Sequence, residues 1–186
     1  PHASGAAAVF VQFYRETHAG QTPSPALVKA ALINTAVDLL DEFGTAPVPN
    51  NDEGWGRIDL ISFFDSSIVF DYTDQTVSMT EGQVFEKRVI LSDSSQPLKV
   101  TLTYTDVPAF PGAVPALVND LDLEILGPNG SLYRGNQFHN GESIADAPSA
   151  DRLNNVEGFL LWEPPPGLYT IRVRAVKVAA DSRIET

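Results

Sequence analysis

Two aspartates with one residue between them, Asp120 and Asp122, form the pattern in this 186-residue chain that points most directly to chemistry. They lie on a predicted strand, where successive side chains alternate between faces, so both carboxylates are expected on one face and Leu121 on the other. Like charges about 6–7 Å apart repel unless a cation or a basic group lies between them. Because calcium prefers hard oxygen ligands, the pair predicts a calcium site.

The other calcium ligands are predicted among acidic and amide side chains nearby. The predicted set is Asp106, Asn119, Asp120, Asp122, Asn155 and Glu157, with Asn154 as a further candidate. Two alternatives need no metal. The carboxylates could accept hydrogen bonds from a turn, or they could pair with Arg152 or Arg134.

Nucleophilic hydrolysis of the serine type requires a nucleophile, a histidine base and an acid that orients the base. The chain contains His2, His18 and His139. His18 is expected at a polar helix end and His139 in a loop, so both are interpreted as surface residues. The chain contains no cysteine, which excludes a disulfide, a thiolate zinc site and a cysteine nucleophile.

Composition narrows the possible partners. Asp and Glu number 24 against 12 Lys and Arg, which gives a net charge of −12. Phosphate binding needs clustered basic residues, so no nucleic-acid partner is expected. No run of about 18 apolar residues occurs, so no membrane partner is expected either. A hydrophobic content of 43% is enough for a globular core.

The first third of the chain is predicted to be helical. Small residues followed by apolar ones at helical spacing indicate a helix over residues 3–17. Ser24 and Pro25 are a cap and a first helical residue, and they predict a second helix that runs to about Leu40 and is apolar on most faces. A loop is expected over residues 41–56, and Asp59 is expected to cap a short helix through Phe64.

Alternating apolar segments after Ile68 predict strands. The predicted strands are Ile68–Tyr72, Val84–Leu91, Leu98–Tyr104, Leu121–Leu126, Leu132–Tyr133, Phe159–Trp162 and Leu168–Val176. Asn129-Gly130 between two of them is a hairpin signal. The number of strands and turns predicts an antiparallel β-sandwich, jelly-roll-like, with a boundary to the helical part near residues 65–67.

The helical part resembles the end of the catalytic domain of subtilisin-like serine peptidases, or subtilases. Pro1, His2 and Gly5 match the last three fixed positions of the motif Gly-Thr-Ser-Met-Ala-x-Pro-His-x-x-Gly. Residues 24–36 resemble the next helix of that family, and residues 54–60 resemble its Gly-x-Gly-x-(Ile/Val)-(Asn/Asp) segment. The three segments occur in the order of the family.

The part after Ile68 resembles the β-sandwich that follows the catalytic domain in some secreted alkaline subtilases. The resemblance rests on four segments, residues 117–123, 127–130, 154–157 and 167–171. Together the two resemblances imply a mixed fold, with residues 1–66 as the helical C-terminal remnant of an α/β subtilase domain and residues 67–186 as the sandwich.

The resemblance implies that the chemistry lies elsewhere in the parent protein. The nucleophilic serine is expected just upstream of Pro1, and the acid, the base and the oxyanion asparagine precede it, so no catalytic residue is assigned to this chain. His2 follows the nucleophile in the motif and is expected to pack near the start of the helix. The implied parent is a secreted, extracellular serine endopeptidase that hydrolyses polypeptides. The chain would stabilise the N-terminal part of its catalytic domain and be inactive alone.

The resemblance also bears on calcium, because the related sandwiches bind it around the strand that corresponds to residues 121–126. A second site in those relatives uses an Asp-rich loop, matched here by residues 135–152. Gln137 stands where the relatives carry Asp, although Glu142, Asp146 and Asp151 remain. Two other interpretations stay open: a non-catalytic β-sandwich that serves adhesion or binding, and a nicked product that stays bound to an N-terminal chain with the triad.

Overall fold

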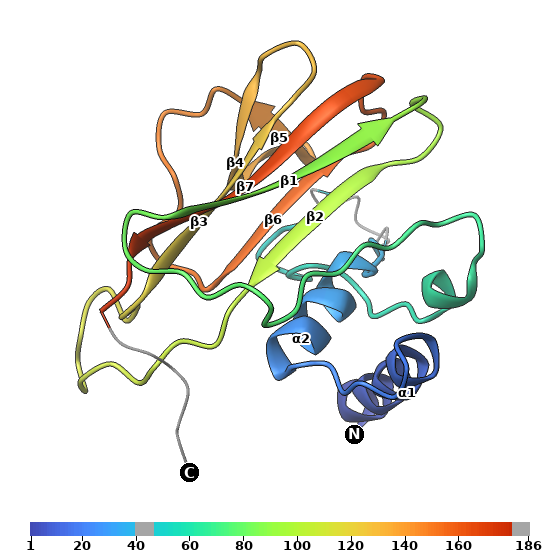
Figure 1. The fold of residues 1–186 in the computed structure, drawn as a ribbon, viewed down its shortest axis with the longest axis horizontal. Coiled ribbons are helices and arrows are strands. Elements are labelled where there is room, and N and C mark those ends of the chain that lie inside the picture. The colour runs from blue at the N-terminus through green and yellow to red at the C-terminus, as the bar shows by residue number, and fades with distance from the viewer. Residues whose placement is uncertain (40–46, 180–186) are drawn as a thin grey trace. The chain divides into compact units, whose positions relative to one another are not determined.

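The computed structural model describes residues 1–39 and 47–179, which fall into two compact units. Residues 1–76 form the helical unit and residues from Val77 onward form the β unit. The helical unit contains α1 (His2–Thr17), α2 (Pro25–Asn34) and the 3-10 helix η1 (Ile61–Phe64) (Figure 1). Among the described residues, no helix is both long enough and apolar enough to cross a bilayer.

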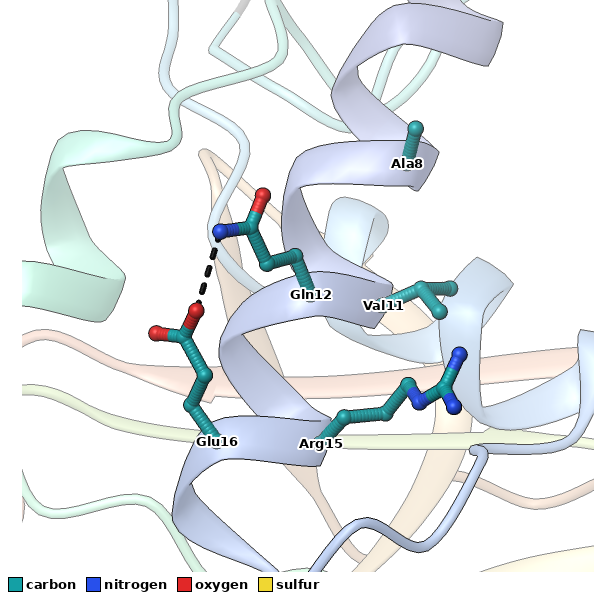
Figure 2. Close-up of a pocket in the computed structure, with 5 residues that line it drawn as sticks. All are labelled: Ala8, Val11, Gln12, Arg15 and Glu16. Carbon is teal, nitrogen blue, oxygen red and sulfur yellow. Dashed lines mark hydrogen bonds between the residues drawn. The ribbon is translucent and has the colours of Figure 1, made fainter.

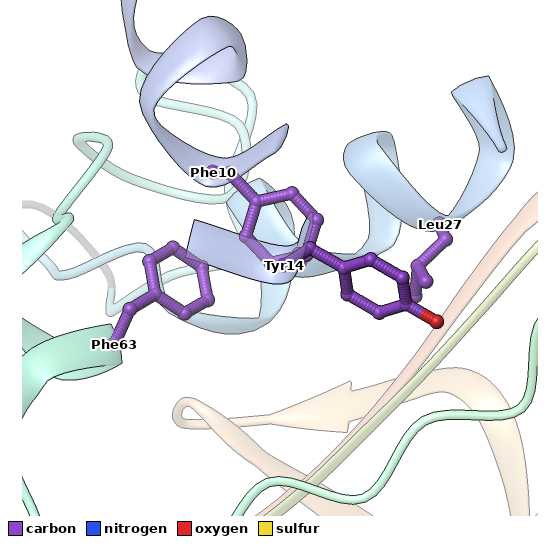
Figure 3. Packing of buried hydrophobic residues seen from close by; sticks show 5 residues of the cluster. Phe10, Tyr14, Leu27 and Phe63 are labelled. Carbon is purple, nitrogen blue, oxygen red and sulfur yellow. The ribbon is translucent and has the colours of Figure 1, made fainter. Parts of the chain in front are cut away.

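The core of the helical unit is a cluster of aromatic rings. Ala6, Phe10 and Tyr14 form a buried stripe along α1, as the spacing of four residues requires. Phe10 is fully buried, and its ring centroid lies 4.9 Å from that of Phe63 in η1. Leu27 of α2 belongs to the same cluster (Figure 3). The three helical elements are therefore joined mainly by apolar contacts.

α2 begins as predicted and ends earlier than predicted. The Ser24 hydroxyl accepts a hydrogen bond of 3.0 Å from the Leu27 amide, and Pro25 is the first helical residue. The helix ends at Asn34 rather than near Leu40, because the Thr35 hydroxyl caps the Ala31 carbonyl and Val37 then pairs with Arg57 in an isolated bridge. Leu40 itself lies outside the described residues.

The segment Ile68–Tyr72 was predicted as a strand, and it is not one. Phe70 and Tyr72 instead pack against the aromatic cluster of the helical unit, with their rings stacked at a centroid distance of 6.0 Å. An extended segment that lies against a core buries alternate residues just as a strand does. The division between the units therefore falls after Thr76, later than the predicted boundary near residues 65–67.

The β unit is built from seven strands within the described residues. They are β1 (Val84–Leu91), β2 (Leu98–Thr103), β3 (Asp120–Leu126), β4 (Leu132–His139), β5 (Glu142–Ala145), β6 (Val156–Leu161) and β7 (Gly167–Lys177). β1-β7-β3-β4-β5 form one sheet and β2-β6 a second, and every pairing is antiparallel, as predicted (Figure 1). Leu123, Ile125 and Tyr169 of the first sheet and Phe159 of the second form the core.

Side chains of β4 and β5 join the two sheets along the edge of β6 that faces away from β2. Asn136 donates to the Val156 carbonyl at 2.7 Å and accepts from the Gly158 amide at 2.9 Å. Farther along, the Ser143 hydroxyl accepts from the Leu160 amide at 3.0 Å. The Glu142 carboxylate accepts from the Trp162 amide at 2.8 Å. Side chains thus supply the hydrogen bonds that a neighbouring strand would otherwise provide.

Candidate functional site

Asp120 and Asp122 share one face of β3, and a guanidinium group lies against both. The two terminal nitrogens of Arg152 donate to the two carboxylate oxygens of Asp122, with Nη2 at 3.0 Å from Oδ2. Arg152 Nε lies 3.4 Å from Asp120 Oδ2. The forked contact is the strongest geometry available to an arginine and a carboxylate. Of the sequence-based alternatives, pairing with Arg152 is the arrangement that the structure has.

Asp120, Asp122 and Arg152 differ in burial, and the pKa values of Asp120 and Arg152 are shifted. The Asp122 side chain is 4% exposed and that of Asp120 is 13% exposed, whereas Arg152 is half exposed. Burial raises the pKa of Asp120, and the attraction of Arg152 only partly offsets it. The hydrogen bond to Asp122 raises the pKa of Arg152, so the guanidinium remains charged.

Asp151 organises the loop that carries Arg152. One of its carboxylate oxygens accepts from the Leu153 amide at 2.8 Å, and the other accepts from the side-chain amides of Asn136 at 2.6 Å and Asn154 at 2.7 Å. Although burial acts to raise the pKa of Asp151, these hydrogen bonds outweigh it and lower the pKa. The Asp151 carboxylate thus fixes the loop to β4 through its hydrogen bond with Asn136.

Glu157 is the most deeply buried carboxyl of the described residues, with 1% of the residue exposed. Its Oε2 accepts from the Leu123 amide at 2.7 Å, while Oε1 is buried with no hydrogen-bond partner. Burial raises its pKa to about 8, and the charges of Asp122 and Asp151 act in the same direction. Gly135 of β4 leaves the space for this side chain, because a Cβ there would lie 2.6 Å from the Cβ of Glu157.

Asp106 closes a loop of uncharged residues between β2 and β3. Its Oδ1 accepts from the amides of Val107 at 2.9 Å and Asn119 at 3.0 Å, and its Oδ2 accepts from the Val118 amide at 2.7 Å. The side chain of Asn119 accepts from the Ala179 amide at 2.9 Å. Asn155 donates to the Tyr104 carbonyl at 2.9 Å. These three predicted ligands have backbone partners that tie down loops.

Three of the six predicted calcium ligands, Asp106, Asn119 and Asn155, are thus engaged with backbone groups. Within residues 1–39 and 47–179, no three carboxylate or imidazole side chains come together in a way that could hold a metal ion. The donors that do face one another, Asp120 and Asp122, have Arg152 between them. As arranged, the residues do not fit a calcium ion at this pair, and calcium binding stays a prediction.

The carboxylates of the second predicted site each accept a hydrogen bond from a backbone amide. Asp146 accepts from the Leu132 amide at 3.2 Å, next to the turn between β3 and β4. Glu142 bonds the Trp162 amide, and Asp151 organises the loop of Arg152. Each carboxylate supports a different turn or strand edge, so this second calcium site also remains a prediction.

The histidines occupy three unrelated positions. His2, the first residue of α1, and His139, the last residue of β4, are exposed. His18 stacks on Tyr14 with ring planes 4° apart and centroids 3.9 Å apart, and its Nδ1 lies 2.8 Å from the Thr17 hydroxyl. His18 is therefore partly buried, and its ring extends the aromatic cluster.

One face of α1 is exposed along its length. Gly5 on this face has no atom within 4 Å of the position that a Cβ would occupy. A shallow surface depression on the helix is lined by Ala8, Val11, Gln12, Arg15 and Glu16 (Figure 2). In it, Gln12 donates to Glu16 at 2.9 Å. Within the described residues, the exposed face of α1 therefore has open space at Gly5, whereas Ala6 on the opposite face is buried.

No protein-family model matches the chain. The chain is 30% identical over 211 residues to a protein of Dictyostelium discoideum named Serine protease/ABC transporter B family protein tagA. The match takes in 97% of this chain but 11% of that protein, so the chain spans about a tenth of its relative's length. The similarity is to a region of a protein whose name includes a serine protease.

Proposed function

We propose that this chain is the C-terminal portion of a secreted subtilisin-like serine endopeptidase, comprising the end of the catalytic domain and an appended β-sandwich. Its role is to hold the catalytic domain in its active arrangement. The observation that carries the proposal is the similarity to a protein named as a serine protease, which takes in 97% of the chain. The similarity thus extends through both units.

The exposed face of α1 supports a structural role. A helix whose interior residues are small usually allows another backbone to approach closely, yet Gly5 has open space around it. Ala8 on the same side of the helix is also exposed (Figure 2). We infer that the N-terminal part of the catalytic domain covers this face in the parent enzyme.

The chemistry that this arrangement would serve is acyl transfer. In the proposed parent a serine just before Pro1 attacks the peptide carbonyl, a histidine takes its proton and an aspartate orients the histidine. The contribution of this chain is positional. Phe10 and Tyr14 anchor α1 to the helical unit, and a fixed helix holds the nucleophile at the reacting distance, where small displacements cost large factors in rate.

The experiment substitutes Gly5→Leu in the isolated chain and in the parent protein. Gly5 costs helix stability of about 1 kcal/mol relative to a good helix former, so the isolated chain should unfold at a slightly higher temperature. In the parent the added side chain should prevent close packing and lower peptidase activity by at least about tenfold, the effect of a lost 1.4 kcal/mol. The two readouts are the unfolding temperature of the chain and the turnover of a peptide substrate by the parent.

Gln96→Leu is the matched control, because Gln96 is exposed in the connection between β1 and β2. It should leave both readouts unchanged. The isolated chain should not cleave peptides. Turnover by the pure chain that a serine-protease inhibitor blocks would contradict the proposal, as would an undiminished activity of the Gly5→Leu parent.

A second candidate function is a non-catalytic binding or adhesion module. The observation that favours it is the self-contained β unit, whose core residues and strand pairings all lie within residues 77–179. On this alternative, residues from 77 onward fold alone and bind a polypeptide or a glycan, and residues 1–76 are dispensable. Expression of the β unit without residues 1–76, followed by a thermal unfolding measurement and a peptide and glycan array, separates the two candidates.

A further inference from the structure

We propose that the guanidinium of Arg152 takes the place of a metal ion between Asp120 and Asp122. The β unit would then be stable without calcium, and loss of Arg152 would make its stability depend on calcium. This inference does not rest on peptidase function, because it concerns the stability of the β unit alone.

The first argument is the geometry of the contact. All three guanidinium nitrogens are engaged: Nη1 and Nη2 with the Asp122 carboxylate, and Nε with Asp120 at 3.4 Å. Nη1 also donates to the backbone carbonyl of Asp151 at 3.0 Å. One positive centre thus touches oxygens from two carboxylates and a carbonyl, which are the ligand types that calcium takes in proteins.

The second argument is electrostatic. The side chain of Asp122 is 4% exposed, and a buried carboxylate without a partner is strongly destabilising. The carboxyl groups of Asp120 and Asp151 lie near it, and Lys177 of β7 acts on Asp120 as well. An uncompensated Asp122 carboxylate would therefore cost the unit much of its stability at neutral pH, and Arg152 supplies the compensating positive charge from within the chain.

The third argument is that the loop holds the arginine in place. Asp151 next to it accepts hydrogen bonds from the Leu153 amide and from the side chains of Asn136 and Asn154. Asn136 in turn is bonded to the backbone of β6. The backbone of Arg152 is therefore fixed to two strands, so little side-chain freedom is lost when the guanidinium contacts the aspartates.

Removal of the arginine would leave oxygen ligands that face a common space. The Asp122 carboxylate, the Asp120 carboxylate and the Asp151 carbonyl would remain where the guanidinium had been. Two uncompensated carboxylates favour a divalent cation. Calcium tolerates irregular geometry and completes its shell with water, so it is the metal expected to bind there.

The experiment measures thermal unfolding of the 186-residue chain carrying Trp55→Phe, in which Trp162 alone reports on the β unit. In this Trp55→Phe background, the Arg152→Ala variant is compared with the chain that keeps Arg152, called the unaltered chain. Both are measured in EDTA and in about 10 mM calcium chloride, a concentration that fills weak sites. The unaltered chain should unfold at the same temperature in both. Arg152→Ala should unfold at least about 10 °C lower in EDTA, and calcium should restore about 5–10 °C of that loss.

Arg172→Ala is the control. Arg172 of β7 pairs with Glu86 of β1 on the same sheet at 2.7 Å, and its cross-strand partner on β3 is Glu124 rather than Asp122. This variant should lose less stability and gain no response to calcium. If Arg152→Ala fails to fold in EDTA, the double variant Arg152→Ala, Asp122→Asn should fold, because the buried charge is gone, and it should not respond to calcium.

Two results would overturn the inference. One is a lower unfolding temperature of the unaltered chain in EDTA than in calcium, which would mean that the unit already depends on a metal. The other is a calcium response of Arg152→Ala no larger than that of Arg172→Ala. Neither result would bear on the peptidase proposal, whose test is the turnover of the parent enzyme.

Discussion

The helical unit and the β unit are stabilised in different ways. The helical unit depends on a single cluster of rings around Phe10, and side chains such as Val9, Ile61 and Phe64 remain exposed on its surface, with Ile61 at 76%. The β unit encloses a core between two sheets and adds a network of buried polar side chains. Apolar packing therefore dominates in the first unit, and packing combined with long-range hydrogen bonds in the second.

The buried polar side chains of the two units also differ in the sequence separation of their hydrogen-bond partners. The hydroxyl groups of the buried Ser24 and Thr35 in the helical unit bond backbone groups three or four residues away, as helix caps do. In the β unit, Glu157 bonds the Leu123 amide and Asn155 bonds the Tyr104 carbonyl, across 34 and 51 residues of sequence. Local bonds form as each helix forms, whereas the distant ones require the β unit to be assembled. The β unit should therefore unfold more cooperatively.

The largest expected effect is that of Phe10→Ala. Phe10 is fully buried and contacts the rings of Phe63 and Tyr72, so its truncation should cost about 3–5 kcal/mol. A core as small as that of the helical unit cannot absorb this loss. In a Trp162→Phe background the fluorescence of Trp55 should then report an unfolded helical unit at room temperature, and in a Trp55→Phe background that of Trp162 should still report a folded β unit.

Phe159→Ala is the counterpart in the β unit, where Phe159 is 2% exposed. It should shift the transition reported by Trp162 and leave that of Trp55 unchanged. If either substitution moves both transitions by the same amount, the two units unfold as one and the comparison fails.

The next effect is a pH dependence that is specific to the β unit. The pKa of Glu157 is raised from 4.5 to about 8 in the folded chain, so between these pH values the folded state keeps a proton that the unfolded state releases. The stabilisation is complete below pH 4.5 and is lost as the pH rises to 8, at up to about 1.4 kcal/mol per pH unit.

Glu157→Gln tests this dependence, because the amide oxygen can still accept from Leu123 and the side chain does not titrate. The difference in unfolding free energy between variant and unaltered chain, measured by urea titration, should grow in favour of the variant from pH 5 to pH 8. Glu86→Gln, which breaks the exposed pair between Glu86 of β1 and Arg172 of β7, should produce no such trend. A difference that is constant with pH would contradict the role assigned to Glu157.

The smallest effect is that of Ser24→Ala in the helical unit. Loss of the hydrogen bond from the Leu27 amide should cost about 1 kcal/mol. The transition of Trp55 should shift by a few degrees, and that of Trp162 should not move. Ser24→Asp, which can cap the same amide, should restore the stability. An unchanged Trp55 transition in Ser24→Ala would show that the cap contributes nothing.

The sequence predicts well the elements whose signals are local. The cap at Ser24 and the alternation in Val84–Leu91 depend on neighbouring residues, and both were found as predicted. β5 was missed because its four residues carry no alternating pattern and the strand forms by pairing with β4. The strand predicted over Ile68–Tyr72 was wrong because the burial of Tyr72 comes from packing against α1, which is distant in the sequence.

The site was predicted in the same uneven way. The alternation along β3 predicts Asp120 and Asp122 on one face. The structure agrees, since Arg152 contacts both carboxylates. Whether a metal or Arg152 contacts the two aspartates depends on where the loop after Ala147 places Arg152. No pattern of neighbouring residues predicts the course of that loop. The space that Gly135 leaves for Glu157 likewise connects two strands that are not neighbours in the sequence.

The side chains along β6 have a consequence for the behaviour of the protein in concentrated solution. An exposed strand edge is a template on which a second molecule can add a strand, and chains of such additions lead to aggregates. Asn136, Ser143 and Glu142 already occupy the amides of Gly158, Leu160 and Trp162. A neighbouring molecule would have to displace three intramolecular hydrogen bonds before it could pair there, so these side chains protect the β6 edge against self-association.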